Sequence, residues 1–356
     1  MKIRDAYSAR AISAVHEEVA SNKIAYLGAG LFPAKKKMGL DLKSVMTYKG
    51  LPVTLKASDF DTVSTIRSRE GAKLLETQMA YFKESMLVKE VDEQEMMRVQ
   101  EASDPYAQDI LARIFNDAEV LIDSADVVAE RMRMQLLSSD GNPSISLQAD
   151  GATYAYNYDP DDEYKDNNFL ECTSTDMWSD HEHSDPMADI QEGLDAVEAV
   201  SGVRPSIAIM TRETLNHVKQ NAKVKSYILA QNVSANVIVN DARVKELFKS
   251  ELGVDIVIYN KQFKNESIKA QLFYPNGYCT LVPNGALGNT WYGTTPDERT
   301  LMGDPNYDTK VVNTGVAVTV TTTSDPVQTK TTVSEILLPS FERMMETYTI
   351  KAYTEE

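Results

Sequence analysis

The sequence holds little of what enzymes and secreted proteins are commonly built on. Only two of its 356 residues are cysteine, Cys172 and Cys279, and only four are histidine. Two cysteines so far apart form neither a disulfide framework nor a metal-binding spacing, which fits a reducing compartment. P-loop, nucleophile-elbow and H-E-x-x-H motifs are missing, and the GAG at 28–30 leads to Pro33 without the third glycine of a dinucleotide-binding loop. We therefore expect no enzyme, no catalytic residue and no cofactor.

Long apolar runs and positive charge are also scarce. No stretch approaches the roughly 18 to 20 consecutive apolar residues of a membrane span, and the N-terminus MKIRDAYSAR lacks the apolar core of a secretory signal. We therefore expect a protein made and used inside a cell, without membrane contact. There are 36 Lys and Arg against 53 Asp and Glu, a net charge of −17. Phosphate backbone repels a protein this acidic, so direct nucleic-acid binding is disfavoured.

The segment His181–Glu182–His183 is the one group of residues that suggests a metal. Two histidines at i and i+2 can share a metal only where the backbone is extended. A solvated acidic loop is the favoured interpretation, because short motifs match often by chance. The acidic stretch 159–189 lacks the spacing of a calcium-binding EF-hand loop. We therefore predict no metal site, and a metalloenzyme built on His181 and His183 stays as an alternative.

What the sequence does contain is a mixture of helices and strands. The clearest helix is predicted over 105–138, where apolar residues recur every 3.6 residues after the N-cap Asp104. Further helices are expected at 5–20, 187–201, 212–230 and 241–251, with helical pieces at Gly71–Glu84 and Glu93–Glu101. The glycines at 28–30 are expected to end regular structure.

Alternating apolar residues predict the strands. A hairpin is expected over 143–158, turning at Asp150–Gly151. Other strands are expected at 206–210, 237–239, 254–259, 270–274 and 279–282, and in a strand-rich tail that ends with 348–353. The fold class is therefore α+β.

Two segments of opposite charge stand out. Residues 34–57 predict a projecting two-stranded ribbon that turns at Lys49–Gly50 and carries Lys35, Lys36, Lys37, Lys43 and Lys49. A lone ribbon is marginal in water, so it must pack on something, and a neighbouring subunit is one candidate. The acidic stretch begins with Asp159, Asp161, Asp162 and Glu163. We expect these residues to make contacts between subunits; a patch within one subunit, or two independent solvated faces, are the alternatives.

The order of these parts resembles the major capsid proteins of tailed bacteriophages, in particular the family of the lambda head protein E. The resemblance covers essentially the whole chain. It is carried by DMWSDHEHSDPMADIQEGLDAV, FYPNGYCTLVPNGALGNTWYG, TPDERTL and DTKVVNTGVAVTVTTTSDPVQTKTTVSEILLPSF, in that order.

The resemblance implies a Hong-Kong-ninety-seven-type capsid fold. Its parts would be an N-terminal arm (1–30), an extended loop (31–88), a peripheral domain (89–185) with spine helix 105–138 and β-hairpin 143–158, an axial domain (186–307), and C-terminal strands (308–356) that return to the peripheral domain.

The resemblance also implies a function and partners. Copies of the chain would form hexamers and pentamers of an icosahedral virion shell around double-stranded DNA, assembled in the cytoplasm of a bacterial host. The implied partners are the protein itself, a separate scaffold protein, a portal protein at one vertex and DNA without sequence-specific contact; a decoration protein is compatible with it. Some relatives crosslink a loop lysine to an asparagine, here Asn306 or Asn313, which we do not expect. An encapsulin-like cellular compartment shell and a monomeric binding protein are the alternatives.

Overall fold

The chain folds into two compact units, each built from three separate segments. The computed structural model describes residues 8–20, 25–46, 73–88, 90–91, 94, 106–149, 152–230, 239–264, 269–301, 307–324 and 327–354. Unit 1 comprises Met1–Lys43, Glu76–Arg131 and Asn289–Ser340, and unit 2 comprises Ser44–Leu75, Met132–Gly288 and Phe341–Glu356. The long helix α5 (Tyr106–Leu137) gives its first turns to unit 1 and its last turns to unit 2.

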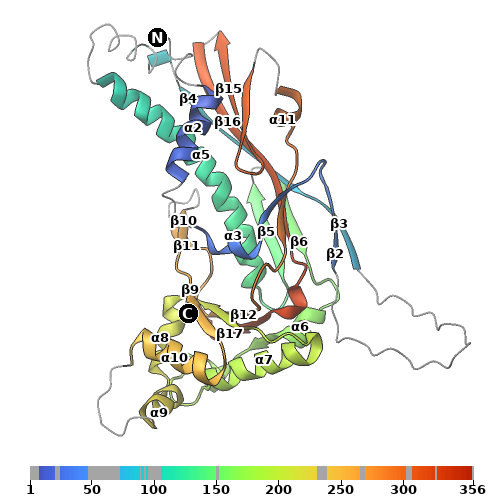
Figure 1. Cartoon of the computed structure of the whole chain (residues 1–356), viewed down its shortest axis with the longest axis vertical. Helices are drawn as coiled ribbons and strands as arrows, with labels where there is room; N and C mark the ends of the chain where they lie inside the picture. Colours follow the sequence, from blue (N-terminus) through green and yellow to red (C-terminus); the bar gives the residue numbers. More distant parts are fainter. Residues whose placement is uncertain are drawn as a thin grey trace, which may run out of the picture. The chain divides into compact units, whose positions relative to one another are not determined.

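Unit 1 is a sheet packed against helices (Figure 1). The strands run in the order β1 (Ala34–Lys36), β13 (Asn289–Tyr292), β16 (Val327–Ser340), β15 (Val316–Ser324) and β14 (Asp308–Val312), and β4 (Ala80–Val88) also pairs with β16. Three short or amphipathic helices, α2 (Ala9–Ala20), α3 (Leu27–Leu31) and α11 (Pro296–Leu301), complete it. Val312 of β14 and the alternating valines of β15 form one core with apolar residues of α2 and α5, because strand alternation turns one set of side chains to the helices.

Unit 2 contains a five-stranded mixed sheet in the order β7 (Phe169–Glu171), β17 (Tyr348–Lys351), β12 (Tyr278–Val282), β8 (Ile207–Met210) and β9 (Asp255–Ile258). Its helices are α6 (Glu163–Asn168), α7 (Pro186–Ser201), α8 (Arg212–Gln220), α9 (Ala222–Ala230) and α10 (Asp241–Glu251). Trp178 and Phe248 are fully buried in the core between sheet and helices. Two hairpin-like pairs, β5 (Ser144–Ala149) with β6 (Ala152–Asn157) and β10 (Gln262–Lys264) with β11 (Ala270–Leu272), also belong to this unit.

Capping side chains and a glycine explain where α7 and α9 begin and where α7 ends. Asp185 accepts a hydrogen bond from the backbone N–H of Ala188 at the start of α7, and Gly202 ends that helix in the left-handed conformation at φ 70°. The single helix expected over 212–230 is two helices, because Asn221 interrupts it. The Asn221 side chain accepts from the N–H groups of Lys223 and Val224 and so caps α9.

Several predicted elements agree with the structure and others need correction. Helix α5 occupies the range expected at 105–138, and β5 and β6 occupy the expected hairpin. The segment expected to be helical over Gly71–Glu84 instead forms β3 (Lys73–Gln78) and β4, because nine residues of β4 pair with β16. The glycines at 28–30 lie inside α3. Residues 47–72, 95–105, 150–151 and 231–238, which hold the turns at Lys49–Gly50 and Asp150–Gly151, most of Glu93–Glu101 and most of the strand expected at 237–239, lie outside the described residues.

Two expected groupings also change. The ribbon expected over 34–57 begins later, because Ala34–Lys36 form β1, which pairs in parallel with β13 in the sheet of unit 1. The partner of β2 (Asp41–Met46) within the described residues is β3. The last strand, β17, does not return to the sheet of β14–β16; it pairs with β12 and β7 in unit 2. No helix in the described part of the chain has both the length and the apolar composition needed to cross a membrane.

Candidate assembly surfaces

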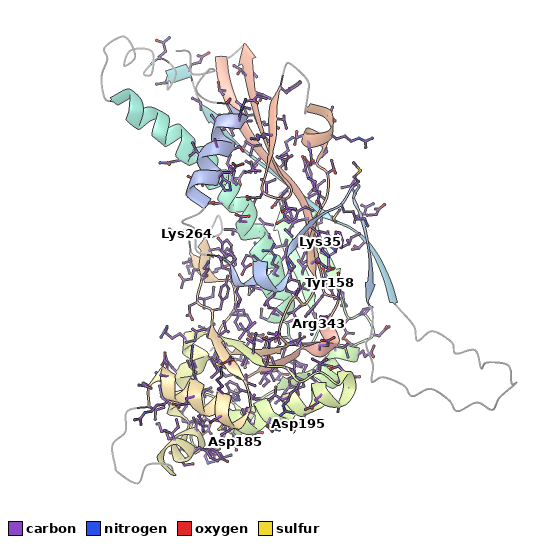
Figure 2. The ribbon with its side chains drawn as sticks, viewed as in Figure 1. Lys35, Tyr158, Asp185, Asp195, Lys264 and Arg343 are labelled. Atoms are coloured by element: carbon purple, nitrogen blue, oxygen red, sulfur yellow. The ribbon has the colours of Figure 1, made fainter. Side chains whose placement is uncertain are left out.

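The basic residues of the expected ribbon are held in different ways. Lys35 lies on β1 with its Nζ 5.5 Å from the centre of the Trp291 ring, a cation–π contact (Figure 2). The Nζ of Lys36 is 2.6 Å from Glu298 Oε2, so this lysine has an ion pair within its own subunit. The backbone N–H of Lys37 donates to the Tyr292 carbonyl at 2.8 Å. The side chain of Lys43 and all of Lys49 lie outside the described residues.

An apolar turn follows these lysines, and the sequence interpretation missed it. Met38 is 89% exposed and Leu40 is 49% exposed, on either side of Gly39 at φ 93°. Glycine fits that backbone conformation because it has no Cβ. The Leu40 carbonyl accepts from the N–H of Met79, which ties the turn to the start of β4. Two large apolar side chains are thus exposed to solvent beside the lysines. The alternation of apolar and polar residues, which we used to predict strands, could not reveal this turn.

The acidic stretch separates into buried and exposed carboxylates. Asp159 is 1% exposed, and its carboxylate accepts from the backbone N–H groups of Glu163 at 3.0 Å, Tyr164 at 2.7 Å and Lys165 at 3.4 Å. It caps the first turn of α6 and has no face left for a neighbouring subunit. Asp159 therefore drops out of the candidate contacts. Asp161 and Asp162 are exposed, Glu163 is half-buried, and Asp162 adopts the left-handed conformation at φ 57°.

Other acids of the stretch also serve the fold of unit 2. Asp189 accepts from the indole N–H of Trp178 at 2.7 Å, and burial raises the pKa of its carboxyl. Asp185, at the start of α7, pairs with Lys223 at 3.2 Å (Figure 2). Asp180 binds the backbone N–H groups of Glu182 and His183. Several carboxylates of the segment thus bind groups of their own subunit, so fewer of them are exposed than the composition indicates.

The two histidines that suggested a metal have separate partners. His181 Nε2 lies 3.0 Å from His217 Nδ1, whereas His183 Nδ1 lies 2.9 Å from Asp180 Oδ2. Burial, followed by the charge of His181, lowers the pKa of His217, and the hydrogen bond that the His183 ring donates to the Asp180 carboxylate raises the pKa of His183. Within the described residues no group of three or more His, Cys, Asp or Glu side chains is arranged to hold a metal ion.

Two solved structures share the fold of this chain over nearly their whole length. A phage-related protein from Bordetella bronchiseptica RB50 is 15% identical with a TM-score of 0.56, covering 95% of this chain and 96% of its own. A protein assigned as the capsid protein of a prophage from Escherichia coli CFT073 is 14% identical with a TM-score of 0.57, covering 98% and 99%. At this identity the likeness establishes the fold. The chain has the Hong-Kong-ninety-seven-type fold of phage shell proteins.

The sequence family agrees with the fold. The family model described as phage major capsid protein E matches residues 8–352. The chain therefore belongs to the phage major capsid protein E family, a family of structural capsid proteins and not of enzymes. Membership implies a virion shell subunit that self-assembles. No curated protein matches the chain in sequence.

An encapsulin is also similar to the chain, more remotely. The SrpI encapsulin of Synechococcus elongatus PCC 7942 is 11% identical with a TM-score of 0.40, covering 90% of this chain and 85% of its own. A likeness at that score gives no support to the compartment-shell alternative.

Proposed function

We propose that this protein builds the head of a tailed phage, as hexamers and pentamers that close an icosahedral shell around double-stranded DNA. The observation that carries the proposal is the match of the capsid family over residues 8–352, which spans both units. The net charge of −17 supports a container that encloses DNA without sequence-specific contact, because an acidic wall does not bind phosphate.

Each unit has a role in this proposal. Unit 1, with most of the spine helix α5, forms the larger part of the peripheral domain, and unit 2 holds the larger part of the axial domain. The hairpin β5–β6, expected in the peripheral domain, belongs to unit 2. Helix α5 has 32 residues, so it extends about 48 Å at 1.5 Å per residue. A rigid helix of that length suits a shell subunit that must keep its shape. The β2–β3 ribbon is the extended loop that reaches a neighbouring copy.

The contacts between copies are proposed from exposure and charge. Lys35, Lys37 and the turn Met38–Leu40 of one copy contact the acidic edge at Asp161–Glu163 of a neighbour. Burial of Met38 would supply an apolar anchor, whereas the charges set register and the rate of association. Partners outside the shell wall are a separate scaffold protein, a portal protein at one vertex and, optionally, a decoration protein, with assembly in the bacterial cytoplasm.

Electron microscopy with sedimentation of the full chain, expressed alone and with a scaffold gene, tests the assembly function. Closed shells, capsomers or tubes are expected. A stable monomer under both conditions would contradict the proposal. The content of nuclease-treated particles separates the alternatives: protected double-stranded DNA in phage-derived particles supports a head, and protected enzyme without DNA supports a cellular compartment.

Charge reversal tests the contact surface. Lys35→Glu with Lys37→Glu should reduce assembly while leaving the subunit folded, and Asp161→Lys in the same chain should restore part of the yield. Lys249→Glu is the matched control, because Lys249 is an exposed lysine of unit 2 that pairs only with the exposed Asp255 among the described ion pairs. Normal shells from the double lysine variant would exclude this charge pairing.

A further inference from the structure

Helix α11 carries two consecutive acidic residues that reach different strands. Thr295 Oγ1 accepts from the backbone N–H of Glu298 at 3.1 Å and so caps the helix. The cap fixes Asp297 and Glu298 on the first turn, directly after β13. Asp297 is buried and Glu298 is mostly covered. Acidic residues suit the first turn of a helix, but burial of a carboxylate requires partners as well.

The partners of Asp297 come from β4 and β16. Its Oδ1 is 3.0 Å from Lys83 Nζ, and its Oδ2 accepts from Ser334 Oγ at 2.7 Å and from the Tyr81 hydroxyl at 3.5 Å. The strand register explains the convergence. Lys83 pairs directly with Ser334, and Tyr81 lies two residues away on the same face of β4. One buried carboxylate therefore joins α11 to both strands.

The partner of Glu298 comes from β1. Its Oε2 is 2.6 Å from Lys36 Nζ. Lys36 pairs with Tyr292, the last residue of β13, so β1 passes beside the start of the segment that leads into α11. The two acids thus hold one lysine on β1 and one on β4.

These two strands are the roots of the β2–β3 ribbon. β1 ends at Lys36, five residues before β2 begins at Asp41, and β4 begins at Ala80, two residues after β3 ends at Gln78. The chain therefore leaves the sheet of unit 1 after β1 and rejoins that sheet at β4. Helix α11 binds the outgoing root through Glu298 and the incoming root through Asp297.

We propose that α11 is a two-point latch that positions the β2–β3 ribbon, and that Asp297, Glu298, Lys36 and Lys83 are its positioning residues. The latch holds the two chain segments that connect the ribbon to the sheet of unit 1. That pre-organisation favours one geometry of contact between copies, because fewer ribbon orientations must be lost when copies bind. The role in assembly rests on the function proposed above, whereas the effect on the ribbon roots exists in a single subunit.

A double-mutant cycle in unassembled subunits tests the latch. Lys36→Met and Glu298→Gln should each speed hydrogen exchange of the amides in β1, β2 and the start of β4 by about fivefold, the scale of one partly covered ion pair. The double variant should exchange no faster than either single variant, because both substitutions remove the same contact. Asp297→Asn should likewise speed the hydrogen exchange of amides in β4. Lys249→Met, which breaks the exposed pair with Asp255 in unit 2, should leave these amides unchanged.

The same variants are then assembled. The wild-type chain should give uniform shells, and the latch variants should give mixed products such as tubes and open sheets. The circular dichroism spectra of the unassembled subunits should stay the same, which shows that the variants are folded. Unchanged exchange in both single variants, or additive effects in the double variant, would overturn the latch. Uniform shells from loosened variants would overturn its role in assembly. Failure of the wild-type chain to assemble would count against the proposed function alone, because the exchange cycle still tests the latch.

Discussion

Replacing Asp159 with alanine tests whether this carboxylate stabilises the fold, unlike the neighbouring carboxylates on the surface. Asp159 and Asp161 are two residues apart in the same acidic stretch, and charge pattern treats them alike. In the structure Asp159 is buried with three backbone N–H groups of α6 on its carboxylate, and Asp161 is exposed. We expect Asp159→Ala to destabilise unit 2 and Asp161→Ala to leave its stability unchanged while lowering assembly.

The magnitude follows from the hydrogen bonds. Replacing a helix cap by alanine costs about 0.5–2 kcal/mol, and a buried donor left without its acceptor costs about 1–3 kcal/mol. The bonds at 2.7 and 3.0 Å are good ones and that at 3.4 Å is weak. We therefore expect a loss of about 3 kcal/mol in the free energy of unfolding for Asp159→Ala. At about 2–4 °C per kcal/mol for domains of this size, the melting temperature should fall by about 6–12 °C.

Thermal unfolding of unassembled subunits, followed by circular dichroism, is the assay. Asp159→Asn is the conservative control: it keeps one acceptor oxygen and should lose roughly half as much as alanine. Asp161→Ala should stay within about 0.5 kcal/mol of the wild type, as is usual for exposed sites. Equal melting temperatures for Asp159→Ala and Asp161→Ala would refute the assignment of Asp159 to the α6 cap.

Three further predictions concern unit 2. In a pH titration by NMR, His183 should titrate above and His217 below the ordinary pKa of 6.5, because Asp180 stabilises charged His183 and burial disfavours charged His217. The stabilisation from charged His183 should thus be lost as pH rises through its raised pKa. The stabilisation from neutral His217 should be lost as pH falls from 6.5 towards its lowered pKa. The reverse order of titration would contradict both assignments. Burial raises the pKa of Cys172 and Cys279, so both thiols should resist a disulfide reagent until the chain unfolds; rapid labelling of native subunits would show the burial to be wrong. Gly277→Ala should cost about 3 kcal/mol, because φ is 81° and the added methyl group would collide with the Tyr353 carbonyl oxygen, whereas Gly253→Ala, with φ 72° and open space, should cost only about 1 kcal/mol; equal losses would refute the role of the collision.

The parts of the fold that the sequence predicted are those specified by local features. The 3.6-residue period and N-cap predicted α5, and α10 starts at the residue after its cap Asn240. Such elements need only their own residues. The prediction failed over Gly71–Glu84 because β4 depends on β16, whose pairing residues lie some 250 positions away in the chain. A short mixed segment has no period strong enough to announce a partner at that distance.

The candidate site shows the same limit at the level of single residues. Composition identified the acidic stretch but could not distinguish a capping carboxylate from a surface carboxylate. Asp159–Pro160 was the available sign, since aspartate and proline favour the approach to a helix, and α6 begins three residues later at Glu163. The apolar turn at Met38–Leu40 left no such sign, because its exposure depends on β1 joining β13. The Asp297–Glu298 pair lies in the segment TPDERTL, yet its partners come from three strands that are distant in the sequence, β1, β4 and β16.

That long-range dependence has a consequence for how assembly contacts are specified. The residues proposed to touch a neighbour lie in short local segments, but their positions are set by strands gathered from 34–36, 80–88, 289–292 and 327–340. β16 is common to most of these pairings, since it pairs with β4, β13 and β15. A substitution of a buried residue of β16 can therefore move both strands that flank the ribbon. It would act on β1 through β13, and on β4 directly. We therefore expect a substitution at a buried residue such as Ser334, which donates to Asp297, to affect assembly as well as substitutions of the exposed lysines.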